Sequence, residues 1–290
     1  MSRVIAPSEL IINDDGSVFH LHLKPEQLAD RVVMAGDPAR VTMIASYFDS
    51  IECEVSNREF HSITGSFQGK RITALSHGIG GDNIEIVLNE LDALANIDFE
   101  TRTIKPTFRQ LTLVRIGTSG GLQLDLPIGS YVASVKSIGF DGVIYFNAHH
   151  EKVRDLQMES ELIAQLGWKL DRLLPYVVTA DPSLVEQIVG EGIVKGLTIA
   201  ANGFYGPQGR ELRLPLYDPQ LNEKIEKFDY NGFRITNYEM ESSALSGLSA
   251  LLGHRALTVC NIIAGRIAKE MNVDYKDSMP QLVKTVLERI

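Results

Sequence analysis

Two segments of the sequence combine arginine, glycine and hydroxyl side chains in patterns suited to binding an anion. Residues 113–121 read as a buried strand that carries Arg115 in its apolar run and continues into a loop of threonine, serine and glycine. A guanidinium in such a strand needs an anion to face, and the loop adds hydroxyls and accessible backbone N–H groups. In residues 32–40 a strand again ends in glycine, at Gly36, and a proline starts a helix with Arg40 in its first turn. Two strand ends with two arginines predict one phosphate pocket.

Each of these patterns also has a purely structural interpretation, which the sequence leaves open. Arg115 could pair with a buried carboxylate from elsewhere in the fold, and Arg40 could be a surface residue on a capped helix. A loose glycine cluster at residues 76–83 suits either a close approach of the backbone to a ligand or tight packing of a strand against a helix.

Two further groups of residues suit a sugar and a planar ring. Glu239 and Glu241 lie two residues apart before a helix, so in an extended chain they share a face and could accept hydrogen bonds from vicinal hydroxyls or act as acid and base. They could instead be the negative charge favoured at a helix N-terminus. A loop with Phe204, Gln208 and Arg210 offers an aromatic face, an amide and a guanidinium, which suit a heterocycle. The alternative is a surface loop anchored by its aromatic residue.

The composition is that of an ordinary soluble globular protein and argues against several function classes. Of 290 residues, 44% are hydrophobic and 22% charged, and the net charge of -9 argues against nucleic-acid binding. The two cysteines and seven histidines show no metal-ligand spacing, so we expect no metal and free thiols in a reducing compartment. Neither a signal peptide nor a membrane-spanning run is visible, which predicts a cytoplasmic protein without membrane contact.

Strand-like runs alternate with helical stretches along the chain. The predicted strands are 31–35, 71–76, 111–117, 131–137, 196–201 and 256–264, and the predicted helices are 38–47, 84–95, 160–174, 183–190, 242–252 and 279–290. This alternation predicts one α/β domain over residues 1–290 with a short N-terminal extension of about residues 1–17. In such folds ligands bind at the carboxyl ends of strands, where most of the residues above lie. Residues 99–109 form a polar insertion whose role the sequence does not give.

Taken in order, these segments resemble the nucleoside phosphorylase-I family, most closely its uridine phosphorylase branch, from about Val18 to Arg266. The matching segments are VFHLHL (18–23), MAGDPARV (34–41), NREF (57–60), SHGIGG (76–81), LVRIGTSGGLQ (113–123), FYGPQGR (204–210), NYEMES (237–242) and NIIAGR (261–266). The resemblance implies a central mixed, partly barrel-like β-sheet flanked by helices. It also implies a pentosyltransferase that uses inorganic phosphate as co-substrate, with phosphate attacking C1′ of the nucleoside, and that needs no cofactor.

The resemblance further implies roles for individual residues. The residues implied for phosphate are Gly36, Arg40, Arg115 and Thr118, with Arg58 reaching in from a neighbouring subunit. The residues implied for ribose are Met240 and Glu241, with His20 lent by the neighbour. The residues implied for the base are Gly120, Phe204, Gln208, Arg210 and Arg266. The residues expected to carry catalysis are Arg115, Gln208, Arg210 and Glu241.

The shared sites imply a homo-oligomer, at least a dimer and plausibly a hexamer. The chain departs from the family at three positions. His77 stands where the family often has threonine, and Gly265 stands where it often has asparagine. Asn83 stands where the family has a serine in a monovalent-cation site between subunits, which puts that cation in doubt.

The sequence favours a pyrimidine base without deciding it. The purine branch carries an aspartate near the end of the strand before Arg266, as an acid for the purine N7. No acidic residue lies between Glu241 and Glu270 in this chain. The expected reaction is therefore uridine plus phosphate to uracil plus ribose 1-phosphate. The alternatives are a purine or broad-specificity phosphorylase on the same fold and a non-catalytic protein that binds a nucleoside or phosphate.

Overall fold

The structure, a computed structural model, describes residues 3–267, 270–271 and 278–290. The strands of its large sheet are β1 (Arg31–Ala35), β2 (Ser50–Asn57), β3 (Phe60–Phe67), β4 (Lys70–Ser76), β7 (Thr112–Gly121), β8 (Tyr131–Gly139), β9 (Tyr176–Thr179), β10 (Ile193–Ala200), β11 (Asp229–Tyr230), β12 (Phe233–Glu239), β13 (Arg255–Gly265) and β14 (Glu270–Met271). The helices in these ranges are α1 (Pro38–Ala45), α2 (Gly81–Asn96), α3 (Leu156–Leu166), α4 (Pro182–Ile188), α5 (Leu221–Lys227), α6 (Ser242–Leu252) and α7 (Met279–Arg289).

Part of the sheet closes on itself. Its strand order is β11-β12-β10-β8-β13-β7-β1-β4-β3-β2, and β12 also pairs antiparallel with β7, through Tyr238 with Gly120 and Asn237 with Gly121. The strands β7, β13, β8, β10 and β12 therefore form a closed ring, from which β1, β4, β3 and β2 extend as an open sheet. Parallel and antiparallel pairs occur together in both parts. The predicted α/β domain with a mixed, partly barrel-like sheet is confirmed.

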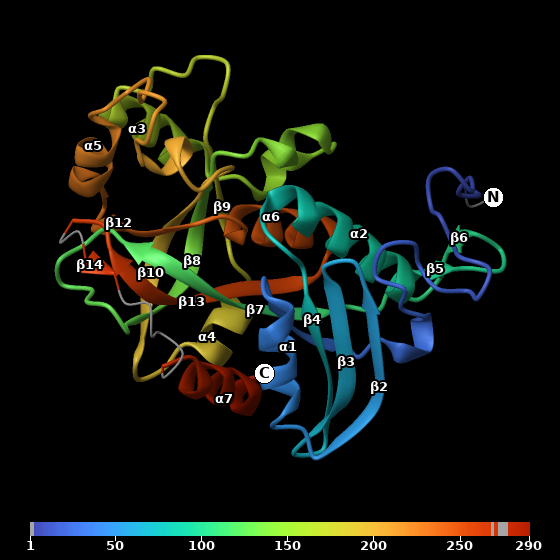
Figure 1. The fold of residues 1–290 in the computed structure, drawn as a ribbon. Helices are drawn as coiled ribbons and strands as arrows, with labels where there is room; N and C mark the ends of the chain where they lie inside the picture. The colour runs from blue at the N-terminus through green and yellow to red at the C-terminus, as the bar shows by residue number, and fades with distance from the viewer. Residues whose placement is uncertain (1–2, 268–269, 272–277) are drawn as a thin grey trace.

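Helices cover both faces of the sheet. Successive residues of a strand point to opposite faces, so neighbouring residues of β1 enter two different cores. In β1, Val33 and Ala35 pack into the core beneath α1, α4 and α7, whereas Val32 and Met34 pack beneath α2 and α6. Figure 1 shows these two groups of helices on opposite sides of the central strands. A third apolar cluster joins α3 and α5 to the barrel strands. No helix in the described ranges is long and apolar enough to cross a membrane.

The insertion at residues 99–109 holds the N-terminal segment. Its strand β6 (Thr103–Ile104) pairs with β5 (Ile97–Asp98) in a separate two-stranded sheet beside that segment (Figure 1). The guanidinium of Arg102 donates from Nε to the Ile5 carbonyl at 2.8 Å, and the Ile5 N–H donates to the Arg102 carbonyl at 2.8 Å. The N-terminal extension is therefore anchored to the fold by an insertion that the sequence left without a role.

Most predicted elements are present, with one clear error. The ranges predicted at 31–35 and 242–252 coincide with β1 and α6, and the other strands differ by a few residues at their ends. The helix predicted at 160–174 is wrong in its position. The helix α3 starts at Leu156, because the Asp155 side chain accepts from the Met158 N–H as an N-cap, and it stops at Gly167, whose φ is +51°.

Candidate active site

A cavity of about 1270 Å³ opens at the ends of β1, β7, β12 and β13. Its lining brings together residues that lie up to 235 positions apart in the sequence, from Gly36 to Met271. The sequence-predicted residues in this lining are Gly36, Arg40, Arg115, Thr118, Gly120, Phe204, Gln208, Arg210, Met240, Glu241 and Arg266. Only His20 and Arg58 of the predicted set are absent from it.

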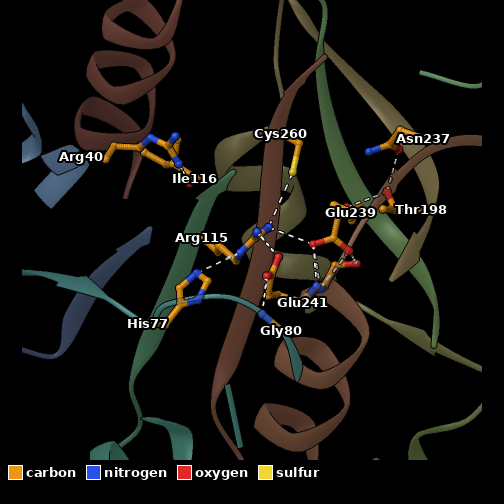
Figure 2. Close-up of polar contacts among 12 residues, drawn as sticks. Arg40, His77, Gly80, Arg115, Ile116, Thr198, Asn237, Glu239, Glu241 and Cys260 are labelled. Atoms are coloured by element: carbon orange, nitrogen blue, oxygen red, sulfur yellow. Dashed lines mark hydrogen bonds and ion pairs between the residues drawn. The ribbon is translucent and has the colours of Figure 1, made fainter. Parts of the chain in front are cut away.

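Arg115 lies at the centre of a buried charge network in the cavity wall (Figure 2). Its Nη1 donates to Glu239 at 2.9 Å and its Nη2 pairs with Glu241, while its Nε donates to Nε2 of His77 at 3.1 Å. Burial acts to lower the pKa of Arg115, but Glu241 and Glu239 outweigh it and raise that pKa, so the guanidinium is always charged. Arg115 therefore does pair with buried carboxylates from elsewhere in the fold, and it also lines the cavity.

The two glutamates have different surroundings. Glu239 ends β12 and accepts hydrogen bonds from the N–H groups of Glu241 and Ser242 and from the Ser242 hydroxyl, so it satisfies the first free N–H of helix α6. Burial raises the pKa of Glu239, Arg115 acts against it, and the charge of Glu241 raises it further. Glu241 accepts the Gly80 N–H at 2.7 Å and lines the cavity. Sequence reasoning placed both on one face, and both line the cavity, but Glu241 makes fewer hydrogen bonds within the protein that a ligand would have to displace.

The end of the cavity at which the sequence analysis expects phosphate is built from the first βα turn. A Cβ on Gly36 would lie 3.0 Å from the Gly78 carbonyl oxygen, so only glycine lets these two turns approach. Asp37 caps α1 by accepting the Ala39 N–H at 2.9 Å, and Arg40 is buried with Nη1 at 3.3 Å from the Ile116 carbonyl. Arg40 is therefore not the exposed surface arginine of the alternative interpretation. It lies beside the strand that carries Arg115.

The opposite end of the cavity gathers an amide and two guanidiniums. Nη1 of Arg210 donates to Oε1 of Gln208 at 2.6 Å, and Nη2 of Arg266 donates to the Gln208 carbonyl at 2.7 Å. Burial, with a smaller effect of Arg266, lowers the pKa of Arg210 to about 10. The guanidinium carbon of Arg210 lies 3.8 Å from the ring centre of Phe204 and covers one face of that ring. A planar base can therefore meet only the other face of Phe204, which the sequence did not indicate.

Gly120 and a bulge in β13 make room for the guanidinium of Arg266. A Cβ on Gly120 would lie 3.2 Å from Cγ and Cδ of Arg266, so the side chain of Arg266 crosses the strand where Gly120 has none. In β13 the register shifts between Ile262 and Ala264, which leaves Ile263 as an extra residue beside the cavity. Bulges of this kind re-aim side chains next to functional sites.

Comparison with known proteins assigns the family. The phosphorylase superfamily matches residues 30–289. The chain belongs to this family. A solved nucleoside phosphorylase of Trypanosoma brucei, described as showing uridine phosphorylase activity, is 31% identical with a TM-score of 0.87, over 97% of this chain and 98% of that one.

Curated relatives point to the same chemistry. A uridine phosphorylase of Thermococcus kodakarensis is 27% identical over 265 residues, 89% of this chain and 80% of that protein. A purine nucleoside phosphorylase of Tolumonas auensis is 26% identical over 244 residues, 84% of each chain. This chain is accordingly a nucleoside phosphorylase, a pentosyltransferase with phosphate as co-substrate.

In this phosphorylase neither His20 nor Arg58 lines the cavity of its own chain, although Glu59, next to Arg58, does. Nδ1 of His20 contacts Glu90 at 2.7 Å, and the His20 carbonyl accepts from the Asn57 side chain at 2.8 Å. The neighbouring Arg58 is exposed, with its guanidinium carbon 5.5 Å from the Phe19 ring centre. The two residues thus share one surface, as expected if both serve another subunit.

Asn83 is the residue whose replacement of serine put the monovalent cation in doubt. The side-chain amide of Asn83 donates to Oε1 of Glu59 at 3.3 Å, so it directs N–H groups at the carboxylate where a cation would need oxygen ligands. Among the described residues no cluster of three or more His, Cys, Asp or Glu could hold a metal ion.

Proposed function

We propose that this phosphorylase acts on pyrimidine nucleosides and that uridine is its substrate: uridine and phosphate give uracil and ribose 1-phosphate, reversibly. The observation that carries the proposal is the base end of the cavity, where Gln208, Arg210 and Arg266 converge. No acidic side chain is among the described residues lining that end.

These groups match the edge of uracil. Uracil presents two carbonyl acceptors and one N3–H donor, while Gln208 offers an acceptor and two donors and Arg210 offers donors alone. As the N-glycosidic bond breaks, negative charge develops on the same two carbonyls. Hydrogen bonds to them therefore strengthen in the transition state, which is where they accelerate the reaction.

At the other end the chain would hold the nucleophile. Phosphate attacks C1′, the bond from C1′ to a phosphate oxygen forms, and the electron pair of the N-glycosidic bond leaves with the base. The sugar passes through an oxocarbenium-like state, so the protein works by placement and electrostatics. Arg40 and Arg115, with Arg58 of a neighbouring subunit, would bind phosphate, and Gly36 and Thr118 would shape its site. Glu241 and Met240 would hold the ribose, with His20 of the neighbour at its 5′-hydroxyl.

A purine substrate is the competing candidate, because relatives of this chain include purine nucleoside phosphorylases. The test is a panel of uridine, thymidine, inosine and adenosine, each with and without phosphate, on the unaltered protein. We expect phosphate-dependent release of uracil with the highest kcat/KM. Equal or better phosphorolysis of inosine would overturn the pyrimidine assignment and leave the phosphate site standing.

A further inference from the structure

His77 connects the two strand ends that make up the phosphate end of the cavity. It directly follows β4, its side chain is fully buried, and its N–H donates to the Ala35 carbonyl at 2.9 Å. Cε1 of its ring would lie 3.7 Å from a Cβ on Gly36, so the ring packs behind the first turn. On its other side Nε2 meets Nε of Arg115 at 3.1 Å (Figure 2).

The contact with Arg115 fixes the protonation of the ring. An arginine side chain has five N–H donors and no acceptor, so Nε2 of His77 must present a lone pair. The histidine must therefore be neutral, with its proton on Nδ1. Burial lowers the pKa of His77 well below its usual value, and the charges of Arg115 and Arg40 act in the same direction. The environment thus maintains the state that the hydrogen bond requires.

The same contact leaves the two ends of the guanidinium for other partners. With Nε bound to His77, Nη1 reaches Glu239 and Nη2 reaches Glu241. Each terminal nitrogen carries two N–H groups. Nη1 also donates to Sγ of Cys260 at 3.7 Å, so the second N–H of Nη2 is the one that remains for a ligand in the cavity. A guanidinium is planar, and fixing its Nε direction together with one Nη contact fixes the plane in which those N–H groups point.

We propose that His77 is the positioning residue of the phosphate site: its neutral ring accepts the Nε–H of Arg115 and so aims the guanidinium at phosphate. This inference rests on the proposal that Arg115 binds phosphate, and it is independent of which base the enzyme accepts. Loss of the acceptor removes a hydrogen bond to a charged group and lets the guanidinium rotate toward Glu239 and Glu241.

Two neutral amide substitutions separate this role from simple core filling. In His77→Gln the side-chain oxygen can take the place of Nε2, whereas in His77→Asn the shorter side chain reaches only the place of Nδ1. We expect His77→Gln to stay within about threefold of the unaltered protein in KM for phosphate, and His77→Asn to raise it about tenfold or more. The KM for the nucleoside changes little in either variant.

Direct binding gives a readout that does not depend on turnover. Inorganic phosphate raises the Tm of a protein that binds it, whereas potassium chloride at equal ionic strength does not. We expect this rise to persist in His77→Gln and to be much smaller in His77→Asn. The matched control is His254→Gln, another buried histidine, which bonds to Asp92 and the Leu111 N–H away from the cavity. It should lower Tm without changing the response to phosphate.

Three results would overturn the proposal. His77→Asn could bind phosphate as well as the unaltered protein, or the two amide variants could be weakened equally. Nitrogen-15 NMR of the unaltered protein could show a proton on Nε2 of His77, and this measurement does not depend on whether any variant folds. If phosphate binding is retained in Arg115→Lys, the phosphate site itself is misplaced, which is a separate failure.

Discussion

Glu90 holds His20 and its neighbour Leu21 through three contacts at once. Its carboxylate accepts the N–H groups of His20 and Leu21 and contacts Nδ1 of the His20 ring at 2.7 Å. A carboxylate on Nδ1 holds the ring proton there and leaves Nε2 as an acceptor. A buried glutamate on α2 therefore sets both the backbone and the tautomer of the histidine proposed to reach a neighbour's ribose.

Replacing Glu90 with glutamine tests this arrangement. The amide keeps one acceptor but turns N–H groups toward the backbone donors of the loop, so we expect KM for uridine to rise about tenfold. The rise should largely vanish with 5′-deoxyuridine, which lacks the hydroxyl that His20 would meet. Glu85→Gln on the same helix is the control. An equal loss with both substrates would show that Glu90 only supports the fold.

Gln208 is expected to carry much of the base recognition. Gln208→Ala removes the only side-chain acceptor in the base set of Gln208, Arg210 and Arg266, and it frees Arg210 from its 2.6 Å contact. We expect kcat for uridine to fall by more than about tenfold with Tm nearly unchanged. Gln187→Ala, on the surface far from the cavity, serves as the matched variant. Turnover within twofold of normal would remove Gln208 from the site.

Arg115 cannot simply be deleted, because Glu239 and Glu241 would be left as unpaired buried charges. Arg115→Lys keeps the charge but loses the fork and the Nε–H. We expect a loss of about 2–4 kcal/mol in kcat/KM for phosphate, since one ammonium cannot satisfy both carboxylates and the ligand. Steady-state kinetics at varied phosphate, with Tm as the fold check, measure it. Near-normal phosphorolysis would make Arg115 a structural residue.

Sharing of sites between subunits can be tested by complementation. Arg58→Ala and Arg115→Lys should each be nearly inactive alone. In a mixed oligomer, one site receives Arg115 from the first variant and Arg58 from the second, so activity should return. Co-expression with two different tags isolates the hybrid. A hybrid as inactive as its parents, or a fully active monomer, would contradict the shared site.

The burial of His77 also leads us to expect that the stability of the protein depends on pH. Its pKa in the folded protein lies well below the usual 6.5, so below that pH the unfolded chain binds a proton that the folded chain refuses. The free energy of unfolding should therefore fall as pH drops from about 6.5, by up to about 1.4 kcal/mol per pH unit from this group. Denaturant unfolding from pH 7 to pH 5 measures it. His77→Gln should have a shallower slope, and identical slopes would mean that His77 titrates normally.

The elements that the sequence predicted well are those with a strong local signal. A short apolar run followed by glycine marked β1, and apolar spacing marked α6. The hairpin of β2 and β3 was not predicted, because β2 is an edge strand whose residues are mostly exposed and whose apolar residues are few. Helix α3 was misplaced because its apolar period continues past Gly167, where the backbone turns out of the helix.

The residues of the candidate site also fall into those with a local sequence signal and those without one. Residues within one motif, such as Arg115 with Thr118 or Gln208 with Arg210, could be recognised from spacing. Their partners could not, since His77 lies 38 positions from Arg115 and Glu90 lies 70 positions from His20. A carboxylate on the apolar face of α2 was the one available signal for Glu90. For His77 only the departure from the family's threonine could have drawn attention.

The strand β7 carries Arg115, Thr118 and Gly120 in one unbroken run of backbone. A strand advances roughly 3.3 Å per residue, so the separation between the proposed anion end and the proposed base end is a covalent length, set by the count of peptide units. Loops and side chains adjust the width of the cavity, but they cannot change this length. An insertion or deletion between Arg115 and Gly120 would alter it in steps of one residue, each of which also shifts the pairing with β12 and β13. The number of residues between Arg115 and Gly120 is therefore as much a part of the site as their side chains.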